Sequence, residues 1–278
     1  MVDTDRYPLT APGSSAWHDV VVRVRHDLQQ VGCSVLPRFV RPSHDEAMRG
    51  QGAAIAPLAH DHVEIVNAYN ISSDTALPER HPGAIHMERG NAFVARDAIP
   101  AGFIIHRLYT SALLQRFVAA CVGVPAIHPL ADPLAGLCLN VVTPGRSHPW
   151  HFDTNEFSVS VLTQAAEAGG TFEYCPNIRT PQAENFADVR DVLDGRGDGL
   201  VRRLTLRPGD LQLFAGRFSL HRVTPVRGPT ARHSAIFAYS ERPGVVGSAV
   251  RTKQLFGRVL PEHVTAQRHA VRGDRLLD

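Results

Sequence analysis

The stretch HFDTNEFSVSVLTQ, residues 151–164, decides the fold class that the sequence predicts. Polar and apolar side chains alternate along its second half, and this period of two is typical of a strand with one buried face. Similar short runs recur from about residue 137 to 241, separated by turn residues such as Pro144-Gly145 and Gly169-Gly170. These runs are LCLNVVT, TFEY, VRRLTLR, LQLF and ARHSAIFAYS. Their spacing predicts many short antiparallel strands.

The chain before these strands, about residues 15–125, has a helical period instead. Apolar residues from Trp17 to Val31 recur every three or four positions, as on one face of a helix. Ser43 to Glu46 has the pattern of a capping box that opens a second helix. Ser111 is placed to cap a third helix, and Gly123 is placed to end it.

This order of elements predicts a mainly β fold with α-helices. We expect a double-stranded β-helix, that is, a jelly-roll or cupin-like core, buttressed by the N-terminal helices. One further helix, with apolar positions from Phe186 to Leu193, is expected as an insertion among the strands. Residues 242–278 would form a C-terminal extension of the same single domain, which spans 1–278.

Composition limits the kinds of partner that the protein is expected to have. The 278 residues are 44% hydrophobic, and 29 basic against 27 acidic residues give a net charge of +2. No broad cationic field for nucleic acid or a membrane surface is therefore expected. The sequence shows neither a signal peptide nor an apolar run of membrane-spanning length, and its four cysteines form no C-x-x-C pair. We expect a cytoplasmic protein that acts on small molecules, in an oligomeric state that the sequence leaves open.

His151 and Asp153 are the first candidate metal ligands, because side chains two positions apart on a strand project from the same face. His221, much later in the chain, is placed to supply a third ligand. Two imidazoles and one carboxylate on one side of a metal form the facial triad that suits non-haem Fe(II) and leaves positions open for other ligands. A His-x-Asp triplet alone arises often by chance. The segment His60-Asp61-His62 illustrates this, since it has no later partner and suits a solvated turn.

Arg232 and Ser234 share one face of the last predicted strand. If this face lies inside the barrel, the guanidinium needs an anionic partner, because a buried unpaired charge is costly. The distal carboxylate of 2-oxoglutarate matches the guanidinium in geometry, and the Ser234 hydroxyl would add a hydrogen bond. An exposed arginine paired with a nearby acid is the structural alternative. The combined order of motifs favours an oxygenase over a zinc hydrolase, which would leave the Arg-x-Ser strand unexplained.

The motifs as a whole resemble one family, the Fe(II)/2-oxoglutarate oxygenases that include radical halogenases and hydroxylases of free amino acids. The resemblance covers about residues 30–260 and includes ARDAIPAGF, DPLAG, HPWHFDTNEF, GGTFEYCPNIR and PGDLQLFAGRFSLHRVTPVRG. It implies iron at His151, Asp153 and His221, and 2-oxoglutarate at Arg232 and Ser234. O2 would be the second cosubstrate, with ascorbate as reductant in vitro. Halogenases of this type have glycine or alanine in place of Asp153, so the resemblance implies hydroxylation rather than halogenation.

Several residues are candidates for contacting the cosubstrate or the substrate, and each also suits a structural role. His148 occupies the position of a substrate-contacting histidine in the amino-acid halogenases. Ile236 and Ala238 continue the face of Arg232 and favour a less polar substrate side chain. The remaining polar candidates are Asn140 on the strand before the triad, and Glu156 and Arg179 near the expected barrel opening.

The sequence therefore predicts hydroxylation of an unactivated C–H bond in a free amino acid or similar small molecule, in specialised metabolism. Succinate and CO2 would be the co-products. Desaturation or oxidative cyclisation stays open, because hydrogen abstraction is common to all three reactions. A jelly-roll protein that senses 2-oxoglutarate or iron without catalysis is the alternative from another class. Substrate-stimulated succinate formation would separate a sensor from an enzyme.

Overall fold

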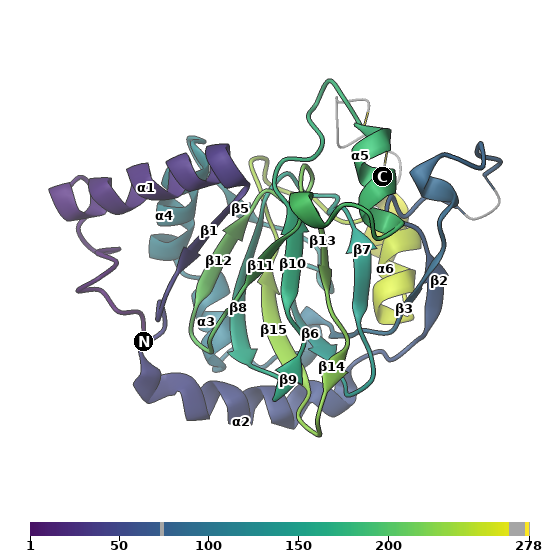
Figure 1. Cartoon of the computed structure of the whole chain (residues 1–278). Coiled ribbons are helices and arrows are strands. Elements are labelled where there is room, and N and C mark those ends of the chain that lie inside the picture. The colour runs from purple at the N-terminus through teal and green to yellow at the C-terminus, as the bar shows by residue number, and fades with distance from the viewer. Residues whose placement is uncertain (73–74, 267–275, 278) are drawn as a thin grey trace.

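Two antiparallel sheets form the core of the protein (Figure 1). The computed structural model describes residues 1–72, 75–266 and 276–277. The larger sheet runs in the order β1 (Cys33–Leu36), β12 (Leu211–Phe214), β8 (Ser158–Gln164), β15 (Arg232–Phe237), β6 (Leu137–Val142) and β4 (Ala92–Val94). The smaller sheet has the order β11 (Arg202–Leu204), β10 (Phe172–Cys175), β13 (Leu220–Val223) and β7 (His148–His151). Strands distant in sequence lie side by side in both sheets, and the expected double-stranded β-helix fold is confirmed.

Three short strand pairs extend this core. β2 (Glu64–Val66) pairs with β3 (Met87–Arg89), β5 (His128–Pro129) with β16 (Tyr239–Ser240), and β9 (Ala168–Gly169) with β14 (Val226–Arg227). The α-helices are α1 (Ser15–Val31), α2 (Asp45–Ile55), α3 (Ile104–Tyr109), α4 (Ala112–Val122), α5 (Phe186–Leu193), α6 (Ala249–Phe256) and α7 (Pro261–Ala266). Short 3-10 helices lie at Pro42–His44, Ala56–Leu58, Pro82–Ala84, Arg96–Ala98 and Asp198–Leu200.

The larger sheet separates the main hydrophobic core from the interior of the barrel. Because side chains alternate along a strand, each strand of this sheet has two faces of different character. One face packs against α1 to α4 and is apolar; its residues include Leu139, Val161, Leu213 and Phe237. The other face is largely polar and lines a cavity; its residues are Cys138, Asn140, Ser158, Ser160, Gln212, Phe214, Arg232, Ser234 and Ile236. The pattern of alternation therefore places the polar side chains of this sheet inside the barrel.

Two of the helix ends predicted for the N-terminal half are confirmed, and one is wrong. The Ser111 hydroxyl caps α4, and Gly123 ends α4 in the left-handed conformation. The Ser14 hydroxyl caps α1, a helix start that was not predicted from the sequence. The capping box at Ser43 does not form, since Ser43 lies in a 3-10 turn and α2 begins at Asp45 without a side-chain cap. Gly52 lies inside α2. It lies so close to His233 of β15 that a side chain would crowd the imidazole, and this closeness lets the helix pack on the sheet.

The predicted continuous strand over residues 151–164 is also wrong. The chain leaves the smaller sheet after His151 and enters the larger one at Ser158. Between them the Phe152 N–H donates to Ala68 O and the Asp153 N–H donates to Gly216 O, so the backbone is held by loops and not by a neighbouring strand. His151 and Asp153 thus meet because the chain crosses between the two sheets, not because they share a strand face.

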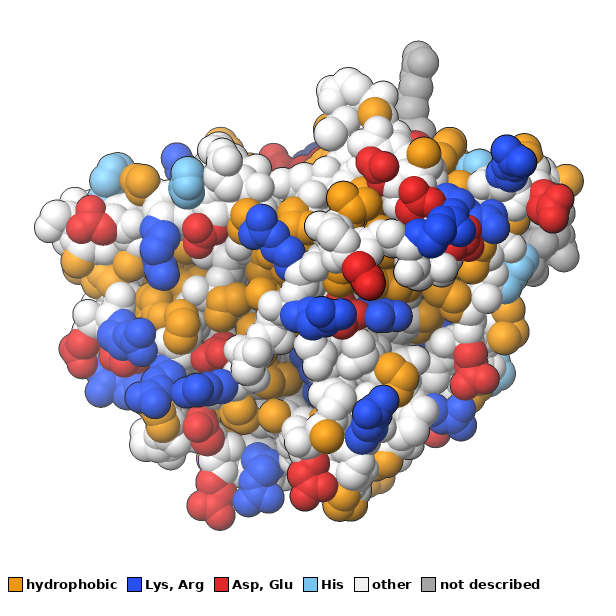
Figure 2. Space-filling model, viewed as in Figure 1, with side chains coloured by type: hydrophobic (Ala, Val, Ile, Leu, Met, Phe, Trp, Pro, Cys, Tyr) orange, Lys and Arg blue, Asp and Glu red, His pale blue; other side chains and the backbone are white. Residues whose placement is uncertain are grey.

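The surface agrees with the nearly balanced composition. Figure 2 shows basic and acidic side chains interspersed on the face drawn there, with hydrophobic side chains between them. Among the described residues, no helix is both long and apolar enough to cross a membrane.

Candidate metal centre

His151, Asp153 and His221 converge at one end of the barrel interior. His151 ends β7, His221 lies opposite it on β13, and Asp153 follows on the loop that leaves β7. Asp153 Oδ1 lies 3.7 Å from His151 Nε2 and 3.5 Å from His221 Nε2. One ligand atom from each residue lies within 4.8 Å of the others, and no other such group occurs in the part of the chain that the structure describes.

The two imidazoles are oriented by backbone carbonyls. His151 Nδ1 lies 2.8 Å from Pro149 O, and His221 Nδ1 lies 3.0 Å from Ser219 O. A carbonyl only accepts hydrogen bonds, so each Nδ1 carries the proton, and each Nε2 is left unprotonated and able to bind a metal. Metal-binding histidines are commonly fixed in this way, and the donor set therefore fits a divalent metal.

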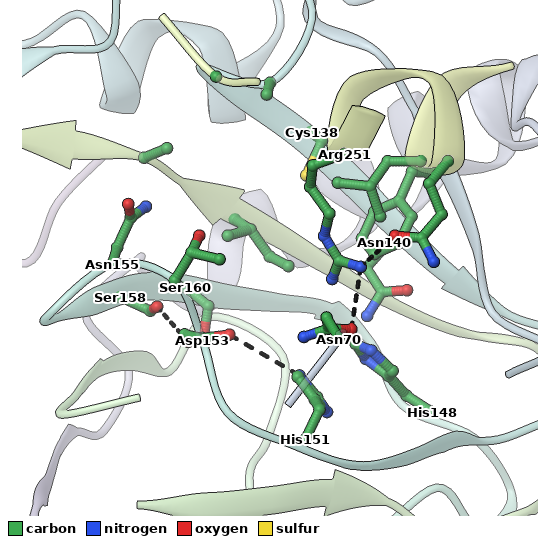
Figure 3. A pocket seen from close by; sticks show the side chains of 18 of the residues that line it. Asn70, Cys138, Asn140, His148, His151, Asp153, Asn155, Ser158, Ser160 and Arg251 are labelled. Carbon is green, nitrogen blue, oxygen red and sulfur yellow. Dashed lines mark hydrogen bonds and ion pairs between the residues drawn. The ribbon is translucent and has the colours of Figure 1, made fainter. Parts of the chain in front are cut away.

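Two residues, Ser158 and Gly216, closely surround the Asp153 carboxylate. The Ser158 hydroxyl donates to Asp153 Oδ2, as Figure 3 shows. On the other side lies Gly216, where a Cβ atom would overlap the same carboxylate oxygen. The loop after β12 thus provides the room in which the carboxylate turns toward the two histidines.

The protonation states suit metal binding at neutral pH. Burial and the neighbouring His221 lower the pKa of His151 to about 3, against the opposing effect of Asp153. Although burial acts to raise the pKa of Asp153, the interactions with His221, His151 and Ser158 outweigh it and hold that pKa below its ordinary value. A neutral imidazole and an ionised carboxylate are the forms that bind metal.

The triad opens on a cavity of about 750 Å³. Arg232 and Ser234 of β15 line it, and both residues are buried, at 4% and 6% exposure. Within the described residues, Arg232 forms neither a hydrogen bond nor an ion pair, and burial lowers its pKa only to about 10, so it stays charged at neutral pH. A buried guanidinium without a partner inside a cavity is suited to an anionic ligand.

The structure brings most of the predicted contact residues to this cavity. His148 lines it with its ring stacked on His151 at a centroid distance of 3.8 Å. Asn140 lines it and accepts a hydrogen bond from Asn91. Ile236 and Ala238 lie on the cavity wall, as the alternation along the strand predicts.

Glu156 and Arg179 lie outside the cavity lining, so the structure corrects their expected place. Glu156 is exposed on the loop between β7 and β8. Arg179 is fully buried in a separate network, where it donates to the carbonyls of Arg217 and Leu277 and to the Glu184 carboxylate. Its guanidinium also lies 3.8 Å from the ring centroid of Phe152, behind the triad loop. Arg179 therefore supports the loop, and its charge is already compensated.

Arg251 and Asn70 are site residues that sequence reasoning missed. Arg251 reaches the cavity from α6, in the C-terminal extension, and Asn70 from the loop after β2. Asn70 has a φ of 53°, a left-handed conformation that asparagine tolerates better than most residues. Neither residue belongs to a motif, and only the tertiary fold brings them together.

Comparisons with known proteins agree with the geometry. The family described as Halogenase D matches residues 18–250. A prolyl hydroxylase from Trichoplax adhaerens, solved with a hypoxia inducible factor peptide, has a TM-score of 0.53 at 15% identity, covering 81% of this chain and 90% of that one. AviO1 from Streptomyces viridochromogenes has a TM-score of 0.53 at 17% identity, covering 79% and 94%. HygX from Streptomyces hygroscopicus, solved with nickel, 2-oxoglutarate and hygromycin B, has a TM-score of 0.51 at 14% identity, covering 78% and 86%.

Comparison with curated proteins gives no significant match. The structural similarities show a shared fold, whereas the family match extends over most of the sequence and includes the triad and Arg232. The chain belongs to the Halogenase D family, within the Fe(II)/2-oxoglutarate oxygenases.

Proposed function

We propose that this protein is an Fe(II)- and 2-oxoglutarate-dependent oxygenase that hydroxylates an unactivated C–H bond of a free amino acid or similar small molecule. His151, Asp153 and His221 would hold the iron, and Arg232 with Ser234 would hold the distal carboxylate of 2-oxoglutarate. The bound metal and cosubstrate would supply the oxidising chemistry, with O2 as oxidant and with succinate and CO2 as co-products.

The position of Asp153 is the main observation that favours hydroxylation over halogenation. Its carboxylate lies within 3.7 Å of both imidazole Nε2 atoms and is held there by Ser158. Halogenases of this type have glycine or alanine at this position, which frees a metal site for chloride. With a carboxylate in that place, the protein supplies a complete facial triad, and transfer of a hydroxyl group is the expected outcome.

Arg232 supports the use of 2-oxoglutarate. Its guanidinium is buried at 4% exposure, opens on the same cavity as the triad and lacks a partner among the described residues. A keto acid that binds the metal at one end would place its other carboxylate against this guanidinium. The pairing would neutralise both charges in a site shielded from water.

The protein's own contribution to the reaction would be positioning. The cavity, at about 750 Å³, has the size of sites that hold small molecules. Its walls would hold one C–H bond of the substrate near the open metal positions and limit the access of water. Hydroxylation, desaturation and cyclisation differ only after hydrogen abstraction, so the product has to be identified directly.

The test measures succinate release with Fe(II), ascorbate and 2-oxoglutarate across a panel of free amino acids and related small acids and amines. Mass spectrometry of each mixture identifies the product. We expect substrate-dependent succinate with a mass gain of one oxygen atom. A loss of two hydrogens would replace hydroxylation by desaturation or cyclisation. Succinate that no substrate stimulates would favour a sensor of 2-oxoglutarate or iron.

The Asp153→Ala variant provides the control for the metal site. Removing this ligand should abolish hydroxylation, because the facial triad that would hold the iron is then incomplete. An unchanged product yield would contradict the assignment of the triad.

A further inference from the structure

A second arginine, Arg251, enters the cavity from α6, which packs against β4 at the edge of the larger sheet. Figure 3 shows it projecting from α6 toward Asn70 and His148. Its Nη1 group donates to Asn70 Oδ1 at 3.0 Å and to Gln254 Oε1. Both acceptors are neutral amides, and no carboxylate among the described residues forms an ion pair with Arg251. The side chain is thus held in position without compensation of its charge.

A neighbouring arginine, Arg89, adds to the positive charge around Arg251. Arg89 lies close enough to lower the pKa of Arg251, in addition to the larger effect of burial. Arg89 is itself 3% exposed, and its ion pair with Glu64 leaves Nε and Nη1 without hydrogen-bond partners. Glu64 pairs with Arg89 and not with Arg251. The more distant Asp153 and Glu64 carboxylates only partly oppose the effects of burial and Arg89, and the pKa of Arg251, about 10, keeps it charged at neutral pH.

Arg251 and Arg232 mark two separate anion positions. Along β15, Arg232 lies four residues before Ile236, a distance of roughly 13 Å at the rise of a strand. α6 packs at the Ile236 end, where Leu255 and Phe256 contact the cluster that contains Ile236 and Cys138. The guanidinium proposed to bind 2-oxoglutarate thus lies at one end of the cavity, and that of Arg251 lies toward the other.

Beyond the neutral polar groups that border Arg251, many of the residues that line the cavity are apolar. They include Phe93, Cys138, Ile236, Val246, Leu255 and Phe256. Among the described lining residues, Asp153 alone carries a carboxylate, and the metal would use it. No lining acid is left to pair with a cationic side chain of a substrate.

We infer that Arg251 binds the carboxylate of the substrate, and that the substrates are carboxylic acids, amino acids included, whose remaining body is apolar. This inference rests on the proposed function and specifies its substrate class. The acid would lie between Asn70 and α6, with its hydrocarbon part along Ile236 and Phe93 and directed toward the metal. An α-ammonium group would stay beside the substrate's own carboxylate, whereas the ammonium of a cationic side chain, as in lysine, would be buried apart from it without a partner.

The test compares four probes that differ in charged groups: leucine, 4-methylpentanoate, 3-methylbutylamine and lysine. Binding is measured by calorimetry on the full chain loaded with Ni(II) and 2-oxoglutarate, so that no turnover occurs. Leucine and 4-methylpentanoate should bind, and the amine and lysine should bind at least tenfold more weakly. Arg251→Gln should weaken the binding of the two acids by roughly tenfold or more, because a charged hydrogen bond is lost. Arg251→Lys should keep part of the affinity, since it retains the charge.

Lys253→Gln is the matched control, because Lys253 is exposed on the same helix and outside the cavity lining. It should leave acid binding unchanged, and thermal melts of all variants report on folding. The inference is overturned if neither acid binds, if the amine binds as tightly as the acids, or if folded Arg251→Gln retains acid affinity. A wild-type protein that fails to bind 2-oxoglutarate would instead reject the proposed function, and this inference with it.

Discussion

Gly216 leaves the space in which the metal-binding carboxylate lies. A Cβ atom at this position would overlap Asp153 Oδ2, and the Gly216 carbonyl also accepts a hydrogen bond from the Asp153 N–H. The loop therefore resists moving away from an added methyl group, and the carboxylate has to turn from the histidines instead. We expect Gly216→Ala to weaken metal binding by about 10- to 100-fold, as lost support of a metal ligand commonly does.

Titration of the metal-free protein with Fe(II) under anaerobic conditions measures this effect. Gly102→Ala is the control, since an added Cβ there meets no atom within 4 Å. Both variants exchange glycine for alanine, so equal losses of metal affinity would show that the crowding at Asp153 is irrelevant.

Arg232 gives a second prediction at the scale of one residue. Replacing it with Met should raise the concentration of 2-oxoglutarate needed for half-saturation by roughly tenfold or more. The same change should leave the ligand-free protein equally or more stable, because a buried charge without a partner is removed. Binding titration and chemical denaturation measure the two effects.

Arg116→Met, on the exposed surface of α4, is the control for Arg232. It should change neither the 2-oxoglutarate concentration for half-saturation nor the stability of the ligand-free protein by much. If Arg232→Met destabilises the ligand-free protein strongly, the guanidinium has a structural partner, and a ligand is not its main reason for being buried.

At the scale of the element, Glu173 ties together three strands of the smaller sheet. It lies on β10 opposite Arg203 of β11 and Arg222 of β13, and its carboxylate accepts hydrogen bonds at 2.8 and 2.7 Å from them. β13 carries His221, so this pairing supports the metal centre from the outer face. Glu173→Gln should lower the free energy of unfolding by about 1 kcal/mol, since solvent screens the partly exposed arginines.

The pH dependence of stability tests the same pairing. Burial acts to raise the pKa of Glu173, but the two arginines outweigh it and lower the pKa below its ordinary value of 4.5. The folded protein therefore releases this proton more readily than the unfolded chain does. The stabilisation is present above pH 4.5 and is lost as the pH falls below it.

The difference in unfolding free energy between wild type and Glu173→Gln should thus shrink from pH 7 to pH 3. Glu46→Gln, at a side chain that is 93% exposed, should show a small difference throughout. If the difference in unfolding free energy between wild type and Glu173→Gln does not depend on pH, the charge of Glu173 does not stabilise the fold.

Local sequence patterns predict the elements of this fold better than they predict how the elements meet. Alternation along residues 232–238 places Arg232, Ser234 and Ile236 on one face, and the structure confirms that this face lines the cavity. The same rule fails between His151 and Ser158, because alternation does not tell on which sheet a strand lies. Arg251 could not be predicted, since its role depends on how α6 packs over a cavity built from strands of both sheets.

At the scale of the whole molecule, Asp132 fixes the C-terminal extension to the barrel. Its side chain is fully buried in front of β6 and accepts hydrogen bonds from the backbone of Leu134, Ala135 and Gly247. His263 of α7 completes the set, with Nε2 at 3.2 Å from Asp132 Oδ1, while its Nδ1 accepts from the Leu260 N–H. One carboxylate thus holds both ends of the segment that carries Arg251.

Asp132→Asn should loosen this segment without unfolding the barrel. An amide has one acceptor oxygen in place of two, so at least one of the buried N–H donors loses its partner, at a cost of about 1–3 kcal/mol. Hydrogen exchange should accelerate over residues 247–263, whereas β6, β8 and β15 keep their protection. The affinity for acids should fall, because Arg251 loses its fixed position, while metal affinity should change little.

Asp97→Asn separates this effect from a general loss of charge near the extension. Asp97 pairs with Arg258 in the same segment, but its side chain is 43% exposed, so that ion pair contributes little. Faster exchange over 247–263 in Asp132→Asn alone would show that the buried carboxylate sets the position of α6. Equal exchange in both variants would mean that the apolar contacts of Leu255 and Phe256 hold the helix without it, and that the geometry of the Arg251 end depends on packing rather than on Asp132.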